Sequence, residues 1–254
     1  MASSKILRSK SILLLSDPSL IFAGGTAMEI FNIAGLSIEV PLHVYAPSED
    51  SFLLMKLLDR HLQKNPLNLN NKRILEIGCG SGAVTIYVRK LLSPTAVFAT
   101  DLSIEAIKIA KRNVLRNGEN IESYSFVNAD LCSCFSSSPQ FDLVMINPPY
   151  LPSDPTWLSA DPIKTAVEGG LTGAEVLNSF LSEVTEQLSA ARIAYVYSDL
   201  LNRLIDTNLL IHCGYEIVDR IESVFAGETI FAVMWERSSL TGQQRREETS
   251  NTRS

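Results

Sequence analysis

The stretch Asn147-Pro148-Pro149-Tyr150 directly follows an apolar run and contains residue types that could do chemistry. Proline has no N–H and restricts the residue before it, so this backbone is stiff, extended and rich in unpaired carbonyl oxygens. The Asn147 side-chain oxygen and the Pro148 carbonyl could each accept one hydrogen of a planar –NH2 group, which would aim the nitrogen lone pair at an electrophile. Tyr150 could pack against the flat acceptor and hold it in line. The stretch therefore predicts group transfer to an amide or amine nitrogen, whereas a simple proline-broken strand end explains only the prolines.

A glycine-rich turn, EIGCGSGA, stands between a predicted strand and a predicted helix. Gly78, Gly80 and Gly82 let the backbone approach a ligand closely, beyond the carboxyl ends of the strands of a parallel sheet. Together with Ala83 they also satisfy the looser form of the dinucleotide-binding fingerprint. The glycine pattern alone therefore does not choose between cofactors.

Three carboxylates discriminate between a dinucleotide and other cofactors better than the glycine pattern does. Glu76 lies on the strand before the glycine turn, where it would face a cationic amine rather than a pyrophosphate. Asp101 ends the next strand, where an acid can bind both hydroxyls of a ribose, and Asp130 ends the third strand, where it can meet an adenine amino group. Either aspartate alone is more simply explained as a helix cap or turn residue. As a set with no lysine or arginine among them, the three favour S-adenosylmethionine over a phosphate-bearing cofactor.

Strands and helices must alternate to bring these residues together. Apolar runs predict strands at 72–78, 95–101, 123–130, 141–147 and 192–198, and helical periodicity predicts helices at 48–64, 81–93, 103–117, 172–189 and 199–212. A long loop is expected between the fourth strand and Leu171, and two last strands within 215–237 could pair antiparallel around Gly227. This order predicts an α/β fold: a doubly wound, mostly parallel seven-stranded sheet of the Rossmann-like type, with an antiparallel edge strand.

The length and composition of the chain are typical of a single domain of this kind. The chain has 254 residues, 46% of them hydrophobic, and a net charge of −6. A surface of this sign does not favour nucleic acid as a partner, nor an anionic membrane. No run approaches the ~20 consecutive apolar residues that a membrane-spanning helix needs.

The first residues contain Lys5, Arg8 and Lys10, several serines and no acid before Asp17. This composition resembles a weak organelle-targeting segment or a short signal peptide, although an unstructured leader is the preferred interpretation. Met28 is a candidate second start site, because the domain pattern begins only beyond it.

We therefore divide the chain into a flexible leader at 1–40, a methyltransferase domain at 41–236 and a disordered tail at 237–254, which lacks apolar periodicity. The expected location is the cytoplasm, with the nucleus as a second location and organelle targeting by the leader left open.

The order of these motifs resembles the class I methyltransferases, and more narrowly the HemK-type release-factor glutamine methyltransferases, in particular their short eukaryotic members. Three further stretches carry this resemblance: VYAPSEDSFLL at 44–54, the loop at 154–177 with Gly169, Gly170 and Gly173, and AGETIFAVMW at 226–235. The match covers roughly residues 40–236. Ala46 stands where the family usually has an acid, and Val224 lies near a position where a basic or polar residue is expected, which bears on substrate affinity.

The resemblance implies S-adenosylmethionine as cofactor and the N5 atom of the glutamine in the Gly-Gly-Gln loop of the class I translation termination factor as acceptor. It also implies an obligate partner, a small zinc-binding activator that covers an apolar edge of the sheet. The cofactor contacts it implies, together with the glycine turn, are Ser51, Glu76, Gly78, Gly80, Asp101, Leu102, Asp130, Leu131 and Asn147. The acceptor contacts it implies are Asn147, Pro148, Pro149, Tyr150 and Leu151; no metal ligands are expected.

Two other functions use the same residues. N6-adenine methylation of DNA or RNA needs an exocyclic amine held in the same way, but it also needs a basic groove, which the acidic composition opposes. Lysine methylation of proteins has been attributed to the family as well. A non-catalytic scaffold is a third alternative, and the intact set Glu76, Asp101, Asp130 and Asn147 argues against it.

Overall fold

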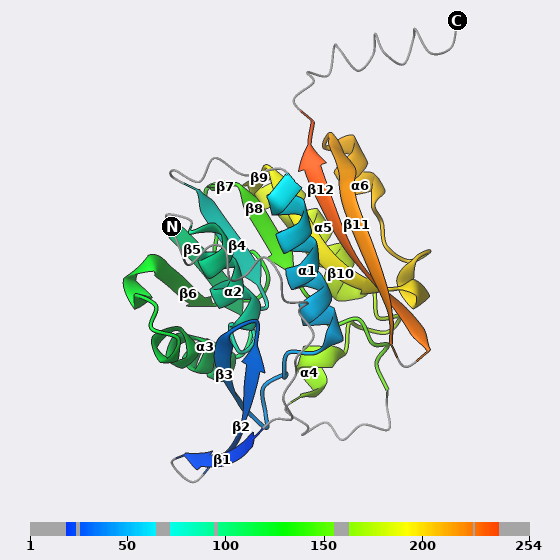
Figure 1. Cartoon of the computed structure of the whole chain (residues 1–254). Helices are drawn as coiled ribbons and strands as arrows, with labels where there is room; N and C mark the ends of the chain where they lie inside the picture. The colour runs from blue at the N-terminus through cyan, green and yellow to red at the C-terminus, as the bar shows by residue number, and fades with distance from the viewer. Residues whose placement is uncertain are drawn as a thin grey trace, which may run out of the picture.

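The structure is a computed structural model that describes residues 19–23, 26–64, 72–93, 96–154, 163–225 and 227–238. Its centre is a seven-stranded sheet with the order β11-β12-β10-β8-β4-β5-β6 (Figure 1). These strands are β4 Arg73–Ile77, β5 Ala96–Asp101, β6 Tyr124–Asn128, β8 Leu143–Ile146, β10 Arg192–Ser198, β11 Tyr215–Phe225 and β12 Glu228–Arg237.

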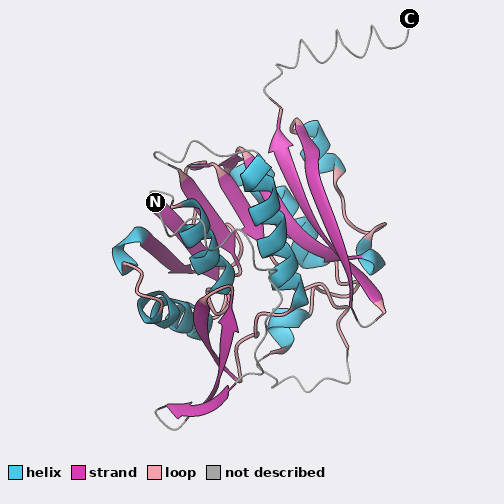
Figure 2. Cartoon of the chain, viewed as in Figure 1, coloured by secondary structure: helices cyan, strands magenta, loops and turns pink. Residues whose placement is uncertain are grey.

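Helices cover both faces of this sheet (Figure 2). Alternate strand residues point to opposite faces, so Ile74 packs in one apolar cluster and its neighbour Leu75 in another. The first cluster includes side chains of α1 Glu49–Lys64, α2 Ala83–Leu92 and α3 Ile104–Arg116, and the second includes those of α5 Glu175–Gln187 and α6 Asn208–His212. Because both faces are buried, the central strands are almost continuously apolar, as in β8 with its sequence LVMI.

The strand directions confirm the predicted fold class. β10, β8, β4, β5 and β6 are parallel to one another, whereas β12 is antiparallel to both β10 and β11. The predicted turn between the last two strands is present, with Gly227 at a φ of 89°. The final pair therefore closes one side of the sheet, with the inverted strand β12 one place in from the edge.

A second, three-stranded antiparallel sheet precedes the domain and corrects the predicted leader. It consists of β1 Ser19–Ala23, β2 Thr26–Ile33 and β3 Leu36–Pro41. The predicted flexible leader up to residue 40 is therefore wrong for these strands, and Ile38 of β3 is fully buried. One reason for this error is that a charged residue, buried Glu39, interrupts the apolar alternation of β3; its carboxylate pairs with Arg116 at 2.6 Å.

Two asparagine side chains, one on α3 and one at its C-terminal cap, attach this small sheet to the domain. Asn113 accepts from the backbone N–H of Glu39 at 2.8 Å and donates to the carbonyls of Glu39 at 2.8 Å and Ser81 at 2.9 Å. Asn117 pairs in the same way with the N–H and the carbonyl of Ser37, both at 2.9 Å. The two amides thus act as a substitute strand along β3, and one of them also reaches the glycine turn.

The predicted continuous helix at 199–212 is present only at its two ends. The structure has a short 3-10 helix at Asp199–Leu201 and then α6. Asn178 of α5 donates to the carbonyl of Leu204 at 2.8 Å and accepts from the N–H of Asp206 at 2.9 Å, which takes both groups out of a helical ladder. This distant side chain is invisible to local periodicity.

The remaining elements are short. They are β7 Gln140–Phe141 paired with β9 Ser189–Ala190, the 3-10 helix Ile121–Ser123, and α4 Lys164–Val167 inside the predicted long loop. The predicted disordered tail lies outside the described residues after Ser238, and part of the predicted 154–177 loop does as well. A search of the described helices for one with the length and hydropathy of a membrane span finds none.

Candidate active site

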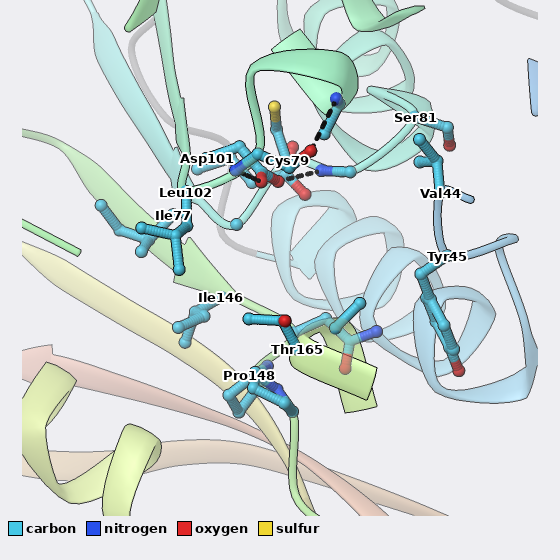
Figure 3. Close-up of a pocket in the computed structure, with 18 of the residues that line it drawn as sticks. Val44, Tyr45, Ile77, Cys79, Ser81, Asp101, Leu102, Ile146, Pro148 and Thr165 are labelled. Carbon is cyan, nitrogen blue, oxygen red and sulfur yellow. Dashed lines mark hydrogen bonds between the residues drawn. The ribbon is translucent and has the colours of Figure 1, made fainter. Parts of the chain in front are cut away.

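A cavity of about 480 Å³ lies beyond the carboxyl ends of β4, β5 and β8. Figure 3 shows Cys79, Asp101 and Leu102 gathered at the glycine turn, with Pro148 and Thr165 together at another part of the wall and Tyr45 on a facing segment. Eleven of the residues singled out in the sequence line this cavity: Ser51, Glu76, Gly78, Gly80, Asp101, Leu102, Asp130, Leu131, Asn147, Pro148 and Pro149.

The glycine turn forms one wall and depends on unusual backbone angles. Gly78 and Gly80 have φ of 69° and 53°, and nothing lies within 4 Å of the position that a Cβ would take at either. That space opens the backbone to a ligand. Gly82 has a different role, because a Cβ there would lie 3.0 Å from the Cβ of Ala110, so this glycine lets α3 pack closely.

Glu76 is the most deeply buried of the three carboxylates. Its side chain is 2% exposed, and the Thr85 hydroxyl donates to its Oε2. Burial raises the pKa of Glu76 to about 8, against which the Thr85 hydrogen bond acts only partly. A carboxyl group held in this way gains most from a cationic partner, because the partner stabilises its ionised form.

Asp101 and Asp130 differ in their surroundings. Asp101 accepts from the backbone N–H groups of Gly80 and Ser103, each at 2.8 Å, and burial raises its pKa. Each of its oxygens keeps acceptor capacity for a ligand hydroxyl. Asp130 is exposed at the cavity wall. Among the described residues that line the cavity there is no lysine or arginine, and a fourth acid, Glu168, is present.

Asn147 follows the end of β8 and has an incompletely satisfied side chain. Its Nδ2 donates to Ser51 Oγ at 3.3 Å. Its Oδ1 has less than 1 Å² exposed and accepts no hydrogen bond from the described residues. A buried acceptor without a donor is costly, so this oxygen is suited to a hydrogen from a ligand.

Two glycines hold the backbone after Asn147 in place. A Cβ at Gly169 would lie 2.6 Å from the carbonyl oxygen of Pro149, and a Cβ at Gly173 would lie 2.5 Å from that of Tyr150. The loop before α5 therefore packs backbone against backbone on the proline segment. This contact explains physically why glycines stand at these two positions.

Two predicted acceptor contacts are not among the residues that line the cavity. The Tyr150 hydroxyl donates to Asp50 Oδ2 at 3.4 Å, and burial and Asp50 raise the pKa of this tyrosine well above its usual range. Leu151 forms an isolated β-bridge with Glu168. The predicted stacking of the Tyr150 ring on an acceptor stays a prediction.

The structure adds cavity residues that the sequence analysis did not single out. They come from the segment after β3 and from α4 and its surroundings: His43, Val44, Tyr45, Pro47, Thr165, Ala166, Glu168 and Val176. All of the first group except His43 lie in the stretch 44–54 that carries the family resemblance, although that stretch did not mark them individually as cavity residues. The second group lies in the long predicted loop, where no periodic pattern marks a site. Among the described residues no cluster of three or more His, Cys, Asp or Glu side chains could hold a metal ion.

Comparison with known proteins places this geometry in a family. Residues 51–160 match the family model described as "Methyltransferase small domain". A protein of Methanocaldococcus jannaschii, provisionally named as a protein N5-glutamine methyltransferase, is 31% identical over 189 residues, which are 74% of this chain and 89% of that protein. The chain belongs to the HemK/Mtq2-type glutamine methyltransferases.

Two further relatives agree with this assignment. The eRF1 methyltransferase catalytic subunit mtq2 of Schizosaccharomyces pombe is 27% identical over 172 residues, covering 63% of this chain and 74% of the relative. A chain of the E. cuniculi Mtq2–Trm112 complex, which methylates the translation termination factor eRF1, superimposes with a TM-score of 0.56 at 28% identity, over 77% of this chain and 99% of that chain. The resemblance to the HemK/Mtq2-type family is confirmed, and its narrowing to eukaryotic members stays a prediction.

Members of the class I methyltransferases use S-adenosylmethionine, and the residues of this cavity fit that group. The buried Glu76 is a carboxyl group that a cationic amine would ionise, the exposed Asp130 adds a second acid, and no basic side chain is present among the described lining residues to select phosphate. The open glycine turn admits a ligand next to Asp101, and Asn147, whose Oδ1 accepts no hydrogen bond from the described residues, lines the same cavity.

Proposed function

We propose that this chain transfers the methyl group of S-adenosylmethionine to the side-chain amide nitrogen of a glutamine, in the Gly-Gly-Gln loop of a class I translation termination factor. The observation that carries the proposal is the buried Asn147 Oδ1 without a donor, in one cavity with three carboxylates. An –NH2 group is the ligand that supplies the missing hydrogen.

Residues at one end of the cavity bind the cofactor, and residues at the other end bind the methyl acceptor. At one end, Glu76 binds a cationic amine, Asp101 binds ribose hydroxyls and Asp130 binds the adenine edge; Ser51, Leu102 and Leu131 complete the wall. At the other end, Asn147 Oδ1 and the Pro148 carbonyl each accept one amide hydrogen, so the nitrogen lone pair is directed at the methyl group.

Little acid–base catalysis is required from the protein. When bound, S-adenosylmethionine supplies a methyl group that is activated by a sulfonium. One N–C bond forms as one S–C bond breaks, and the surplus N–H proton leaves to solvent afterwards. The protein's contribution is therefore alignment and exclusion of competing nucleophiles, which fits a cavity wall of prolines and backbone atoms.

We further propose a small zinc-binding activator as partner, as in the E. cuniculi complex with Trm112. The sheet has two edges. At the β11 edge a bulge between Ile217 and Asp219 interrupts the pairing, which discourages addition of a strand. The β6 edge pairs regularly with β5 and exposes Val127. The β6 edge is thus the better docking surface.

The test uses the chain co-produced with such an activator, labelled S-adenosylmethionine, and a termination factor in two forms, with the loop glutamine and with Gln→Ala. We expect label on the first form only. Duplex DNA, RNA and histone are included as alternative acceptors. Label on a nucleic acid or on lysine, with none on the factor, would overturn the proposal.

A further inference from the structure

The side chain of Asn147 has two ends of similar shape and opposite chemistry. The oxygen accepts hydrogen bonds and the nitrogen donates them, so a rotation of 180° would present a donor where the acceptor –NH2 group needs an acceptor. The proposed reaction therefore depends on which end faces the substrate. Something in the protein must fix that choice.

The contacts of Ser51 provide the fixing element. Its Oγ lies 3.3 Å from Asn147 Nδ2, 3.5 Å from the backbone nitrogen of Ser48 and 3.2 Å from Asp50 Oδ1. A serine hydroxyl has one hydrogen to donate and two lone pairs. The backbone N–H of Ser48 can only donate, and a carboxylate can only accept, so the single hydrogen goes to Asp50. The remaining lone pair can then serve only a donor, which is the NH2 end of Asn147.

The carboxylate of Asp50 is itself held on both sides. Its Oδ1 also accepts from the backbone N–H of Ser51 at 2.5 Å, and its Oδ2 accepts from the hydroxyls of Tyr45 at 3.0 Å and Tyr150 at 3.4 Å. Asp50 is 3% exposed and stands in the first turn of α1. Burial keeps both tyrosines protonated, with pKa values raised above the usual range. They therefore remain donors.

We propose that Asp50 and Ser51 are positioning residues that lock the side-chain amide of Asn147 with its oxygen toward the methyl acceptor. Flipping the amide would set Asn147 Oδ1 against the Ser51 oxygen, two acceptors that share one hydroxyl hydrogen already donated to Asp50, and would turn Nδ2 toward the methyl acceptor. The lock works through hydrogen-bond polarity and not through shape. The inference rests on the proposed function, because it assigns an orientation that only an –NH2 acceptor requires.

Variants at Ser51 test the lock. Ser51→Ala removes the acceptor and frees the amide, so we expect kcat to fall at least tenfold while the Kd for S-adenosylmethionine, measured by calorimetry, stays within about threefold. Ser51→Thr retains the hydroxyl and should restore kcat to within about threefold of the wild type. Ser51→Cys, with a weaker acceptor of similar size, should lie between them. If the Ser51→Ala variant shows no cooperative unfolding transition, the kcat of Ser51→Cys is compared with that of the wild type instead.

A second background separates positioning from simple stability. Asn147→Asp has an oxygen at both ends of the side chain, so its orientation does not matter. We expect Ser51→Ala to lower kcat much less in the Asn147→Asp background than in the wild type. If Ser51 only stabilised the fold, the substitution would lower kcat by the same factor in both backgrounds. Ser182→Ala, which removes a hydroxyl that bonds only Glu186 on α5, is the matched control and should leave kcat unchanged.

The outcomes are distinct. Failure of the wild-type complex to label the termination factor would overturn the proposed function. An active wild type with Ser51→Ala at unchanged kcat would overturn the lock alone. A Ser51→Ala variant that loses only cofactor affinity would also overturn it, because Ser51 would then be simply a cofactor contact.

Discussion

At position 147 an amide is useful because it joins a donor to an acceptor on one rigid plane. The donor is used for anchoring and the acceptor is left for the substrate. The acceptor was visible in the sequence, because two prolines follow Asn147. The anchoring contact was not visible in the sequence, because Ser51 and Asp50 lie 96 and 97 positions earlier, on helix α1.

Asn147→Ala removes the free oxygen and should lower kcat at least about a hundredfold, the effect typical of losing one preorganised polar group in an active site. Cofactor affinity should change by less than about tenfold, because the carboxylates at the other end remain. Single-turnover methyl transfer and calorimetry measure the two quantities. Activity near the wild-type level would show that another group holds the acceptor.

Glu76 makes folding depend on pH in a direction opposite to that of most carboxylates. Its pKa is about 8 in the folded chain and 4.5 as the reference, so the folded state holds the extra proton between these values. The free energy of unfolding should therefore decrease as pH rises from about 4.5 to about 8, by at most about 1.4 kcal/mol per pH unit. Glu76→Gln lacks this titration.

The measurement is the difference in Tm between Glu76→Gln and the wild type without cofactor, from pH 5 to pH 8. We expect the Tm of Glu76→Gln, relative to that of the wild type, to rise steadily from pH 5 to pH 8. A difference that stays constant with pH would mean that Glu76 is ionised throughout.

At the scale of elements, local periodicity predicted those strands and helices whose burial is regular. The strand at 72–78 and the helix at 103–117 are found as β4 and α3 with small shifts at their ends. The failures share a cause: the small N-terminal sheet and the broken helix after Ser198 are both held by distant asparagine side chains, Asn113 and Asn178 respectively. Such contacts leave no trace in the local pattern.

The contact between the glycine loop and the proline segment is a second feature at this scale. Gly169→Ala would place a Cβ closest to the carbonyl oxygen of Gly173 and 2.6 Å from that of Pro149, so the packing of the loop on the segment carrying Asn147 must change. We expect a loss of kcat of at least tenfold with little change in cofactor Kd. Gly118→Ala is the control: its φ of +69° is also unfavourable to alanine, but nothing lies near its Cβ, so stability should fall and kcat should not.

At the scale of the whole molecule, the two free edges of the sheet differ, and this difference can be tested with matched residues. Val127 on β6 and Val218 on β11 are 39% and 40% exposed. Val127→Glu should weaken co-purification of the zinc-binding partner at least tenfold, because it places a charge in an apolar interface. Val218→Glu should leave co-purification unchanged. The opposite result would place the partner at β11.

The position of β12 has a consequence for how the chain is made. This strand holds residues 228–237 but lies between β10 and β11, and its Trp235 is buried with its ring N–H on the Tyr195 hydroxyl at 3.1 Å. A ribosome must therefore synthesise the chain beyond residue 237 before β10 obtains its neighbour on that side. Until then an apolar strand edge stands open, which is the condition under which nascent chains aggregate or recruit chaperones. Premature stop codons before residue 228 should for this reason yield insoluble or degraded product, never a shortened enzyme.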